Sequence, residues 1–430
     1  MFSRIAFPRL AVKPCGFASA TDGSKVAGME RTEVIILGGG LVGLTLAIAL
    51  DAHGVASVVI DPADPEKLLE PGFDGRASAV ASAPWKMLEA IGVGPLIAGE
   101  GCPIAHIEVR DGLSAEALRF DADSPEDPLG YMFENRRLRI GLYERAKAAR
   151  NLTLMAPAMP VETVRDADGV RVTLADGRIV AGSLLVGAEG RKSPTREDAG
   201  FRVARWSYDH VATISTVRHT RPHQNVAHEI FYADGPFALL PLLPGDRSCV
   251  VWSISRRDAE AIKGLPDRAF LAERQKRSGG ILGEFELVSP RSAYPLDFHH
   301  TAKVTDERLV LIGDAAHGIH PIAGQGVNLG YRDVAALAEV LIDGVRLGMD
   351  PGDAQLLARY ERWRSLDGLM VAGSTDAFVH LFGIPGRPAR SARRLGLAAV
   401  ERLPALKRFF MNEARGTTGK LPRLLQGMTV

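Results

Sequence analysis

Apolar runs near the beginning of the chain predict two buried strands with a helix between them. The run at 34–37 passes through a group of glycines into an Ala- and Leu-rich stretch that ends at 50, and a second apolar run follows at 58–60. A short apolar run bounded by a turn is typical of a buried strand, and the longer stretch is typical of a helix. The order strand, helix, strand is the repeating unit of a parallel sheet.

The middle of the chain has a different pattern, in which short apolar runs are separated by turns. Asp168-Gly169 and Asp176-Gly177 are typical of hairpin turns. Strands are expected at 106–120, 211–217, 229–232, 237–243, 248–254 and 309–314. Helices are expected at 75–92, 132–146, 266–278 and 327–347.

We therefore predict an α/β protein with a Rossmann-like nucleotide-binding domain, an inserted β-sheet domain and a helical C-terminal region. The buried strand at 309–314 follows the β-rich segment but continues the pattern of the first strands, so the nucleotide-binding domain is expected to be discontinuous. The expected segments are 1–28 as a disordered extension, 29–105, 130–200 and 296–345 as the nucleotide-binding domain, 106–129 and 201–295 as the β-rich substrate domain, and 346–430 as the helical C-terminal region.

The composition is that of an ordinary globular protein. The 430 residues are 46% hydrophobic and 24% charged, with a formal net charge of +1. No basic run is interleaved with aromatic residues, so no nucleic-acid partner is expected. The three cysteines form no Cys-x-x-Cys pair, which favours a reducing compartment. Because Pro222 separates His219 from His223, no helix would hold them on one face, and no metal site is predicted.

The sequence predicts no membrane-spanning helix, because every long apolar stretch is interrupted by glycine or charge. Residues 1–28 contain four basic residues against one aspartate, a composition that fits an organellar transit segment. In that case the protein would lie on the matrix side of the mitochondrial inner membrane. We favour the alternative, a start at Met29, because the basic stretch has a poor amphipathic period. The protein would then be cytoplasmic, or peripheral on the inner membrane.

Glycines in the first strand–helix turn match a dinucleotide-binding fingerprint. Gly38 permits the tight turn, Gly40 lets phosphates approach the backbone, and Gly43 lets the helix pack closely on the strand. The helix then offers backbone N–H groups to a pyrophosphate. Asp61 ends the next strand, where an acid would bind the adenosine ribose. The alternative is a glycine-rich turn without a ligand, with Asp61 only ending a strand.

The most specific motif begins at Gly313 and reads Gly-Asp-Ala-Ala-His-Gly-Ile-His-Pro-Ile-Ala-Gly-Gln-Gly-Val-Asn-Leu-Gly, continuing to Asp333. Further motifs lie at 74–79, 134–138, 235–242, 294–296 and 421–427. Together they resemble the class A flavoprotein monooxygenases related to para-hydroxybenzoate hydroxylase, and within that family the ubiquinone-biosynthesis hydroxylases. The resemblance runs from about Thr32 to Gly427.

The resemblance implies FAD as the cofactor and assigns the flavin end of the site. Asp314 would bind the ribitol of FAD, and His317 would be structural in that turn. The flavin ring would be surrounded by Pro321, Gly324, Gln325, Gly326, Val327 and Asn328. The N-terminus of the helix that starts there would stabilise negative charge on the reduced flavin.

Three further residues are expected near FAD. Asn135 matches the polar residue that touches the cofactor in this family, with a plain helix N-cap as the alternative. Arg76 is expected to contact the pyrophosphate or the flavin, or else to be a solvated helix-cap arginine. Glu189 stands where the family has aspartate in an Asp-Gly motif, which puts the role of that motif near the pyrophosphate and the nicotinamide path in doubt.

We expect reduced FAD to react with O2 and form a C4a-hydroperoxide, whose distal oxygen is transferred to the ring of a prenylated phenol. No second glycine fingerprint is present, so NAD(P)H would visit transiently or a ferredoxin-type donor would supply electrons. Strand 236–241 is the candidate wall of the substrate pocket, and plain sheet core is the alternative. Rival functions are a flavin halogenase, an isoprenoid reductase and a non-catalytic FAD-bound scaffold of a quinone-biosynthesis complex.

The end of the chain is basic. Residues 381–430 hold ten Lys/Arg against two Asp/Glu, with apolar patches at 403–406 and 409–411. This pattern indicates a surface that contacts a membrane or a ubiquinone-biosynthesis complex. The alternative is a solvated helical face packed on the main body.

Overall fold

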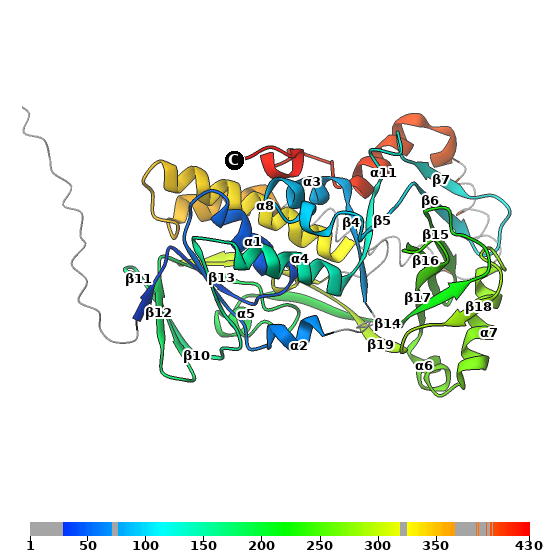
Figure 1. The fold of residues 1–430 in the computed structure, drawn as a ribbon, viewed down its shortest axis with the longest axis horizontal. Coiled ribbons are helices and arrows are strands. Elements are labelled where there is room, and N and C mark those ends of the chain that lie inside the picture. The colour runs from blue at the N-terminus through cyan, green and yellow to red at the C-terminus, as the bar shows by residue number, and fades with distance from the viewer. Residues whose placement is uncertain are drawn as a thin grey trace, which may run out of the picture.

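The computed structural model describes residues 29–70, 76–318, 325–365, 399–430 and the positions 384, 386, 393, 396 and 397. Its first layer is a six-stranded sheet, at the left of Figure 1. The strand order is β20 (Thr305–Asp306), β21 (Leu309–Leu311), β13 (Leu184–Gly187), β2 (Val34–Leu37), β3 (Ser57–Ile60) and β9 (Leu152–Met155). All neighbouring pairs are parallel except β20 with β21. The parallel strands expected at the start of the chain and near 309 are confirmed.

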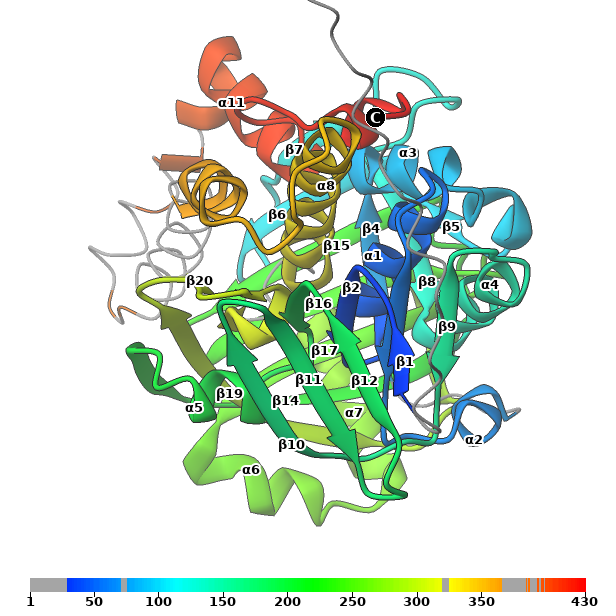
Figure 2. The same ribbon diagram turned by 90° about the vertical axis from the view of Figure 1, so that its left-hand side faces the viewer.

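Alternate side chains of this sheet pack on opposite sides, because successive residues of a strand face opposite ways. Ile36 and Val59 belong to a core shared with α1 (Leu41–Asp51), α4 (Asn135–Lys147) and α8 (Gln325–Arg346). Ile35 belongs to a second core. This core is shared with a four-stranded sheet of β1 (Met29–Arg31), β12 (Ile179–Gly182), β11 (Gly169–Leu174) and β10 (Pro160–Asp166), seen in front in Figure 2. The six-stranded sheet is therefore covered on both faces.

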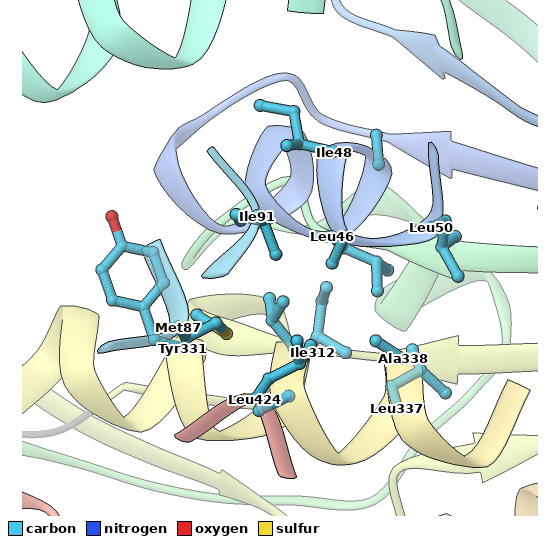
Figure 3. Close-up of a cluster of buried hydrophobic side chains, with 14 of the residues drawn as sticks. Leu46, Ile48, Leu50, Met87, Ile91, Ile312, Tyr331, Leu337, Ala338 and Leu424 are labelled. Atoms are coloured by element: carbon cyan, nitrogen blue, oxygen red, sulfur yellow. The ribbon is translucent and has the colours of Figure 1, made fainter. Parts of the chain in front are cut away.

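The helical side of the core also includes the end of the chain. Figure 3 shows Leu46, Ile312, Leu337 and Leu424 meeting in one apolar cluster. Leu424 comes from η4 (Arg423–Gln426), and it is fully buried. No helix among the described residues is long and apolar enough to cross a membrane.

The second large layer is a nine-stranded sheet. Its order is β22 (His317–Gly318), β19 (Ser292–Thr301), β14 (Val203–His219), β17 (Arg247–Ser255), β16 (Gly235–Leu242), β15 (Val226–Tyr232), β6 (His106–Asp111) and β7 (Leu118–Asp121), with β18 (Phe285–Leu287) on β14. One face packs against α7 (Asp267–Ser278), which lies near α6 (Arg256–Lys263) at the right of Figure 1. The strands and the helix expected between 201 and 295 are confirmed. The domain boundaries themselves stay a proposal.

Two expected helices were wrong at their beginnings. Residues 77–81 form β4 (Ala77–Ala81), and only then does α3 (Ser82–Ala90) begin. Likewise β8 (Gly130–Glu134) precedes α4. The two strands pair with each other, and β8 also pairs with β5 (Cys102–Pro103), which completes a three-stranded sheet. This long-range pairing outweighs the local helical pattern.

Candidate active site

The first glycine turn has the geometry that a dinucleotide requires. Gly38 has φ +105°, and a Cβ there would lie 2.5 Å from the Ala188 carbonyl oxygen. A Cβ on Gly43 would lie 2.0 Å from the carbonyl oxygen of Gly38. A Cβ on Gly40 would meet no atom of the described residues within 4 Å. Gly38 and Gly43 are thus required for packing, whereas the backbone at Gly40 faces open space that a phosphate can enter.

The N-terminus of α1 is available to an anion. Gly40 is its N-cap and provides no side-chain hydrogen bond, so the first-turn N–H groups point toward the open side. Asp61 holds the turn from the neighbouring strand, since it accepts hydrogen bonds from the Gly39 N–H at 2.5 Å and the Ala63 N–H at 2.7 Å. A cavity of about 400 Å³ beside the turn is lined by Gly38, Asp61 and residues 159–163. These features fit the pyrophosphate and ribose of FAD.

The turn that carries Asp314 lies next to α1. Strand β21 leads into η2 (Gly313–Ala315), and Gly313 has φ +58°. A Cβ on Gly313 would lie 3.2 Å from Val42 in the first turn of α1. The structure therefore brings together the two segments that the resemblance assigned to FAD, although they are far apart in the sequence.

Two arginines hold the Asp314 turn from the segment after β13. Arg191 Nε lies 3.2 Å from Asp314 Oδ2, and its Nη1 donates to the Asp297 carbonyl at 2.8 Å. Buried Arg196 donates from Nη1 to the Ala315 carbonyl at 3.0 Å. His299 Nε2 lies 2.8 Å from the Asp314 carbonyl oxygen. Burial and nearby Arg196 lower the pKa of His299 to about 4, so this histidine is neutral at physiological pH.

A buried charge cluster lies behind the same turn. Asp333 of α8 accepts from the Gly313 N–H at 2.9 Å, and its two oxygens lie 2.7 Å from His317 Nε2 and from Arg364 Nε. All three side chains are buried. Although burial opposes it, the charges of His317 and Arg364 lower the pKa of Asp333 to about 2. Asp333 in turn raises the pKa of His317 against the effect of burial. The cluster joins η2, β22, α8 and the helix at 354–365.

The two predicted asparagines, Asn135 and Asn328, both make hydrogen bonds within the protein. Asn328 accepts from the Ala81 N–H at 2.9 Å and donates to the Ala79 carbonyl at 2.8 Å, so its side chain ties the start of α8 to β4. Asn135 is the first residue of α4, whose N-cap is Glu134, so the N-cap alternative is wrong. Its Oδ1 accepts from Ser78 Oγ at 2.7 Å. Contact of either residue with FAD stays a prediction.

The structure gives less information on the remaining predicted site residues. Arg76 is exposed and immediately precedes β4. Gly326 and Val327 lie in the first turn of α8, and a Cβ on Gly326 would meet no atom within 4 Å. Pro321, Gly324 and the side chain of Gln325 lie outside the described part of the chain.

Glu189 has a local role that the resemblance did not assign. Its Oε2 accepts from Ser193 Oγ at 2.5 Å, and Ser193 is the N-cap of α5 (Pro194–Asp198). Burial raises the pKa of the Glu189 carboxyl, against hydrogen bonds from Ser193 and Thr195 that lower it. The carboxyl also lines the cavity beside Gly38. The extra methylene therefore does not remove this acid from the nucleotide side of the site.

Sequence reasoning assigned no role to Arg191, Arg196, Asp333 or Arg364. Asp333 is the last residue of the long motif, and a charge within an apolar helix was a signal that could have been followed. Arg364 had no comparable signal, because it is defined only by a contact with a distant helix.

The two faces of β16, the strand predicted as a pocket wall, pack in different clusters. Phe237 and Leu239 are fully buried in the core beneath α7. Leu240 and Leu242 point to the other face and join a different cluster with Cys249 and Val251 of β17. One face of the strand is therefore sheet core, and a pocket wall on the other face, where Leu240 is partly exposed, stays a prediction.

Together the N-terminus of α1 and the adjacent Asp314 turn form a site that fits a dinucleotide cofactor such as FAD. The chain matches the family of proteins with the FAD binding domain over residues 31–369. It is 47% identical to ubiquinone hydroxylase UbiL of Rhodospirillum rubrum, with 95% of this chain and 96% of that protein covered. It is 34% identical to 3-demethoxyubiquinol 3-hydroxylase of Escherichia coli, with 90% and 99% covered.

The chain therefore belongs to the ubiquinone hydroxylase family of FAD-dependent monooxygenases. Among solved structures, p-nitrophenol 4-monooxygenase PnpA of Pseudomonas putida superimposes with a TM-score of 0.75 at 20% identity, covering 91% of this chain and 100% of that one. At this identity the superposition shows the fold alone, and it confirms the predicted α/β architecture with a Rossmann-like FAD-binding domain.

Proposed function

We propose that this protein uses FAD and O2 to hydroxylate the aromatic ring of a polyprenylated phenol in ubiquinone biosynthesis. The observation that carries the proposal is the meeting of the Gly38–Gly43 turn with the Asp314 turn, beside a sheet face rich in apolar side chains. Relatives named as ubiquinone hydroxylases support the substrate class.

Each part of the site has a defined task in this proposal. The first-turn N–H groups of α1 bind the pyrophosphate, Asp61 binds the ribose, and Asp314 binds the ribitol. The positive end of α8, which begins at Gln325, would stabilise negative charge on the flavin ring. FAD, when bound, supplies the oxygen activation. The apolar sheet face holds the phenol and excludes water.

The test uses the purified protein loaded with FAD, a prenylated phenol that lacks one ring hydroxyl, and isotopically labelled O2. We expect a product with one labelled oxygen on the ring, formed with NADH, NADPH or a reduced ferredoxin as the electron donor. Running the three donors in parallel identifies the reductant. If FAD is bound but no donor gives a labelled product, the proposal is wrong and the scaffold alternative is favoured.

We also propose that α11 (Pro404–Arg415) contacts an anionic membrane surface. Leu403, Leu406 and Phe409 are 53%, 37% and 44% exposed. Arg402 and Arg408 are exposed beside them. Apolar side chains flanked by cations are typical of helices that lie in a membrane interface.

Replacing Leu406 and Phe409 with Asp is expected to weaken binding to phosphatidylglycerol vesicles by about tenfold or more, because two apolar side chains lose their burial in lipid. Vesicle sedimentation measures the change. Leu347→Asp is the matched control, since Leu347 is 78% exposed at the far end of α8. Equal binding by the wild type and the double variant would show that α11 does not contact the membrane.

A further inference from the structure

The nine-stranded sheet has one closed face and one partly open face. On the α7 side, Leu239 and Val250 have no exposed surface. On the other side, Ile214, Leu240 and Val251 remain partly exposed although they belong to an apolar cluster. Ile214 and Val251 are direct cross-strand partners, so these side chains form a continuous apolar surface.

Residues from the end of the chain cover this open face. Leu397, Val400, Phe410 and Met411 pack against the same cluster, and all four are themselves partly exposed. Phe410 and Met411 lie on α11. Partly exposed apolar side chains on both the sheet and its cover indicate a space between them that the described residues do not fully fill.

The inner end of this space lies at the start of α8. Val251 also packs against a second cluster that contains Leu329, which follows directly after Val327 and Asn328. Ala79 belongs to the first cluster, and its carbonyl accepts the Asn328 hydrogen bond. The apolar surface therefore reaches the helix turn that is assigned to the flavin ring.

The outer end of the space opens at the surface. A cavity of about 540 Å³ lies between residues 114–118, in the β6–β7 hairpin, and Leu397, Glu401 and Arg402. Leu118 and Leu397, which line this cavity, are also members of the apolar cluster. The same surface thus extends from α8 to the outside, beside the exposed apolar residues of α11.

We propose that this space is a binding passage for the hydrocarbon tail of the substrate. The passage runs from α8 across Val251 and Leu240 to the cavity at Leu397. A prenyl chain suits it because the chain is long and apolar, and Val251, Leu240 and Leu397 along the passage are apolar as well, whereas the charged Glu401 and Arg402 line only the outer cavity. This inference rests on the proposed function, because it requires a ring held near α8 with a tail that leads outward.

The test compares two phenols that differ only in tail length, one with a single prenyl unit and one with a long polyprenyl chain. Leu240→Trp should narrow the passage in the middle, and Leu397→Trp should narrow it at the outer cavity. We expect each variant to raise the KM for the long-chain phenol by about tenfold or more. Leu397→Trp, at the outer cavity and away from the sheet face that holds the ring, should leave the KM for the short-chain phenol and the kcat for both phenols within about twofold of the wild type.

Leu347→Trp is the matched control, because Leu347 is exposed just after the C-terminal end of the 22-residue α8, whereas the passage begins at the N-terminal end of that helix. Thermal unfolding and flavin content report whether each variant is folded. If Leu240→Trp does not fold, Leu397→Trp alone tests the passage. If Leu397→Trp changes the KM of both phenols equally, or of neither, the proposed passage is wrong.

A binding measurement separates this inference from the proposed function. Titration of the FAD-loaded protein with each phenol, followed by flavin fluorescence, requires no turnover. Selective weakening of long-chain binding would support the passage even if no hydroxylation occurs. If hydroxylation occurs but both variants bind the two phenols as the wild type does, the proposed function stands and the passage is wrong.

Discussion

Replacing Gly43 with alanine is expected to destabilise the protein by about 3 kcal/mol or more and to abolish FAD binding. The new Cβ would lie 2.0 Å from the Gly38 carbonyl oxygen, which is backbone and cannot rotate away. Relief of this clash requires α1 to move away from β2, and that movement displaces the N–H groups that face the pyrophosphate. Denaturant unfolding of the FAD-free protein measures the stability, and flavin absorbance after purification measures the binding.

Gly40→Ala is the matched control for this prediction. A Cβ at Gly40 meets no atom within 4 Å, and its φ of −72° suits alanine, so the unfolding midpoint should stay close to that of the wild type. The added methyl group would still occupy the space assigned to a phosphate, so the Kd for FAD should rise by about tenfold or more. Unchanged FAD affinity in Gly40→Ala would contradict the placement of the pyrophosphate at α1.

Replacing Asp333 with asparagine is expected to cost about 3–5 kcal/mol of stability, because it leaves buried Arg364 and His317 without their shared counter-charge. Asp333 is only 1% exposed, and its Oδ2 also accepts the Gly313 N–H. The Asp314 turn should loosen at the same time, so FAD affinity should fall as well. Chemical denaturation and flavin fluorescence titration measure the two effects. A stability loss below about 1 kcal/mol would show that the cluster contributes little.

His317→Gln is the comparison that isolates one ion pair of this cluster by its pH dependence. The pKa of His317 is raised above 6.5 in the folded protein, so the stabilisation from its charge is complete below 6.5 and is lost as the pH rises through the raised value. The stability advantage of the wild type over His317→Gln should therefore be larger in mildly acidic buffer than in alkaline buffer. The depressed pKa of Asp333, about 2, keeps its carboxylate ionised throughout this range.

Features that depend on neighbouring residues could be predicted from the sequence. The turn at Gly38 and the short apolar strands β2 and β3 follow from backbone conformation and from runs of adjacent side chains. The same holds for strands β14 to β17 and for the hairpins at Asp168 and Asp176. Strand β4 and the start of α4 could not be predicted in this way, because pairing of β4 with β8 outweighs their helical pattern.

The sequence by itself determined the dinucleotide turn, because that turn depends on local backbone conformation, and it indicated the FAD-dependent class and the family through the resemblance that short contiguous motifs carry. Only the tertiary structure decided which charges hold the Asp314 turn, since Arg191 and Arg196 reach it from the segment after β13 and Arg364 acts through Asp333 of α8. It also decided that Leu239 is core while Leu240 faces the open side of the sheet. The physical reason is that burial and ion pairing depend on what the rest of the chain places opposite a side chain.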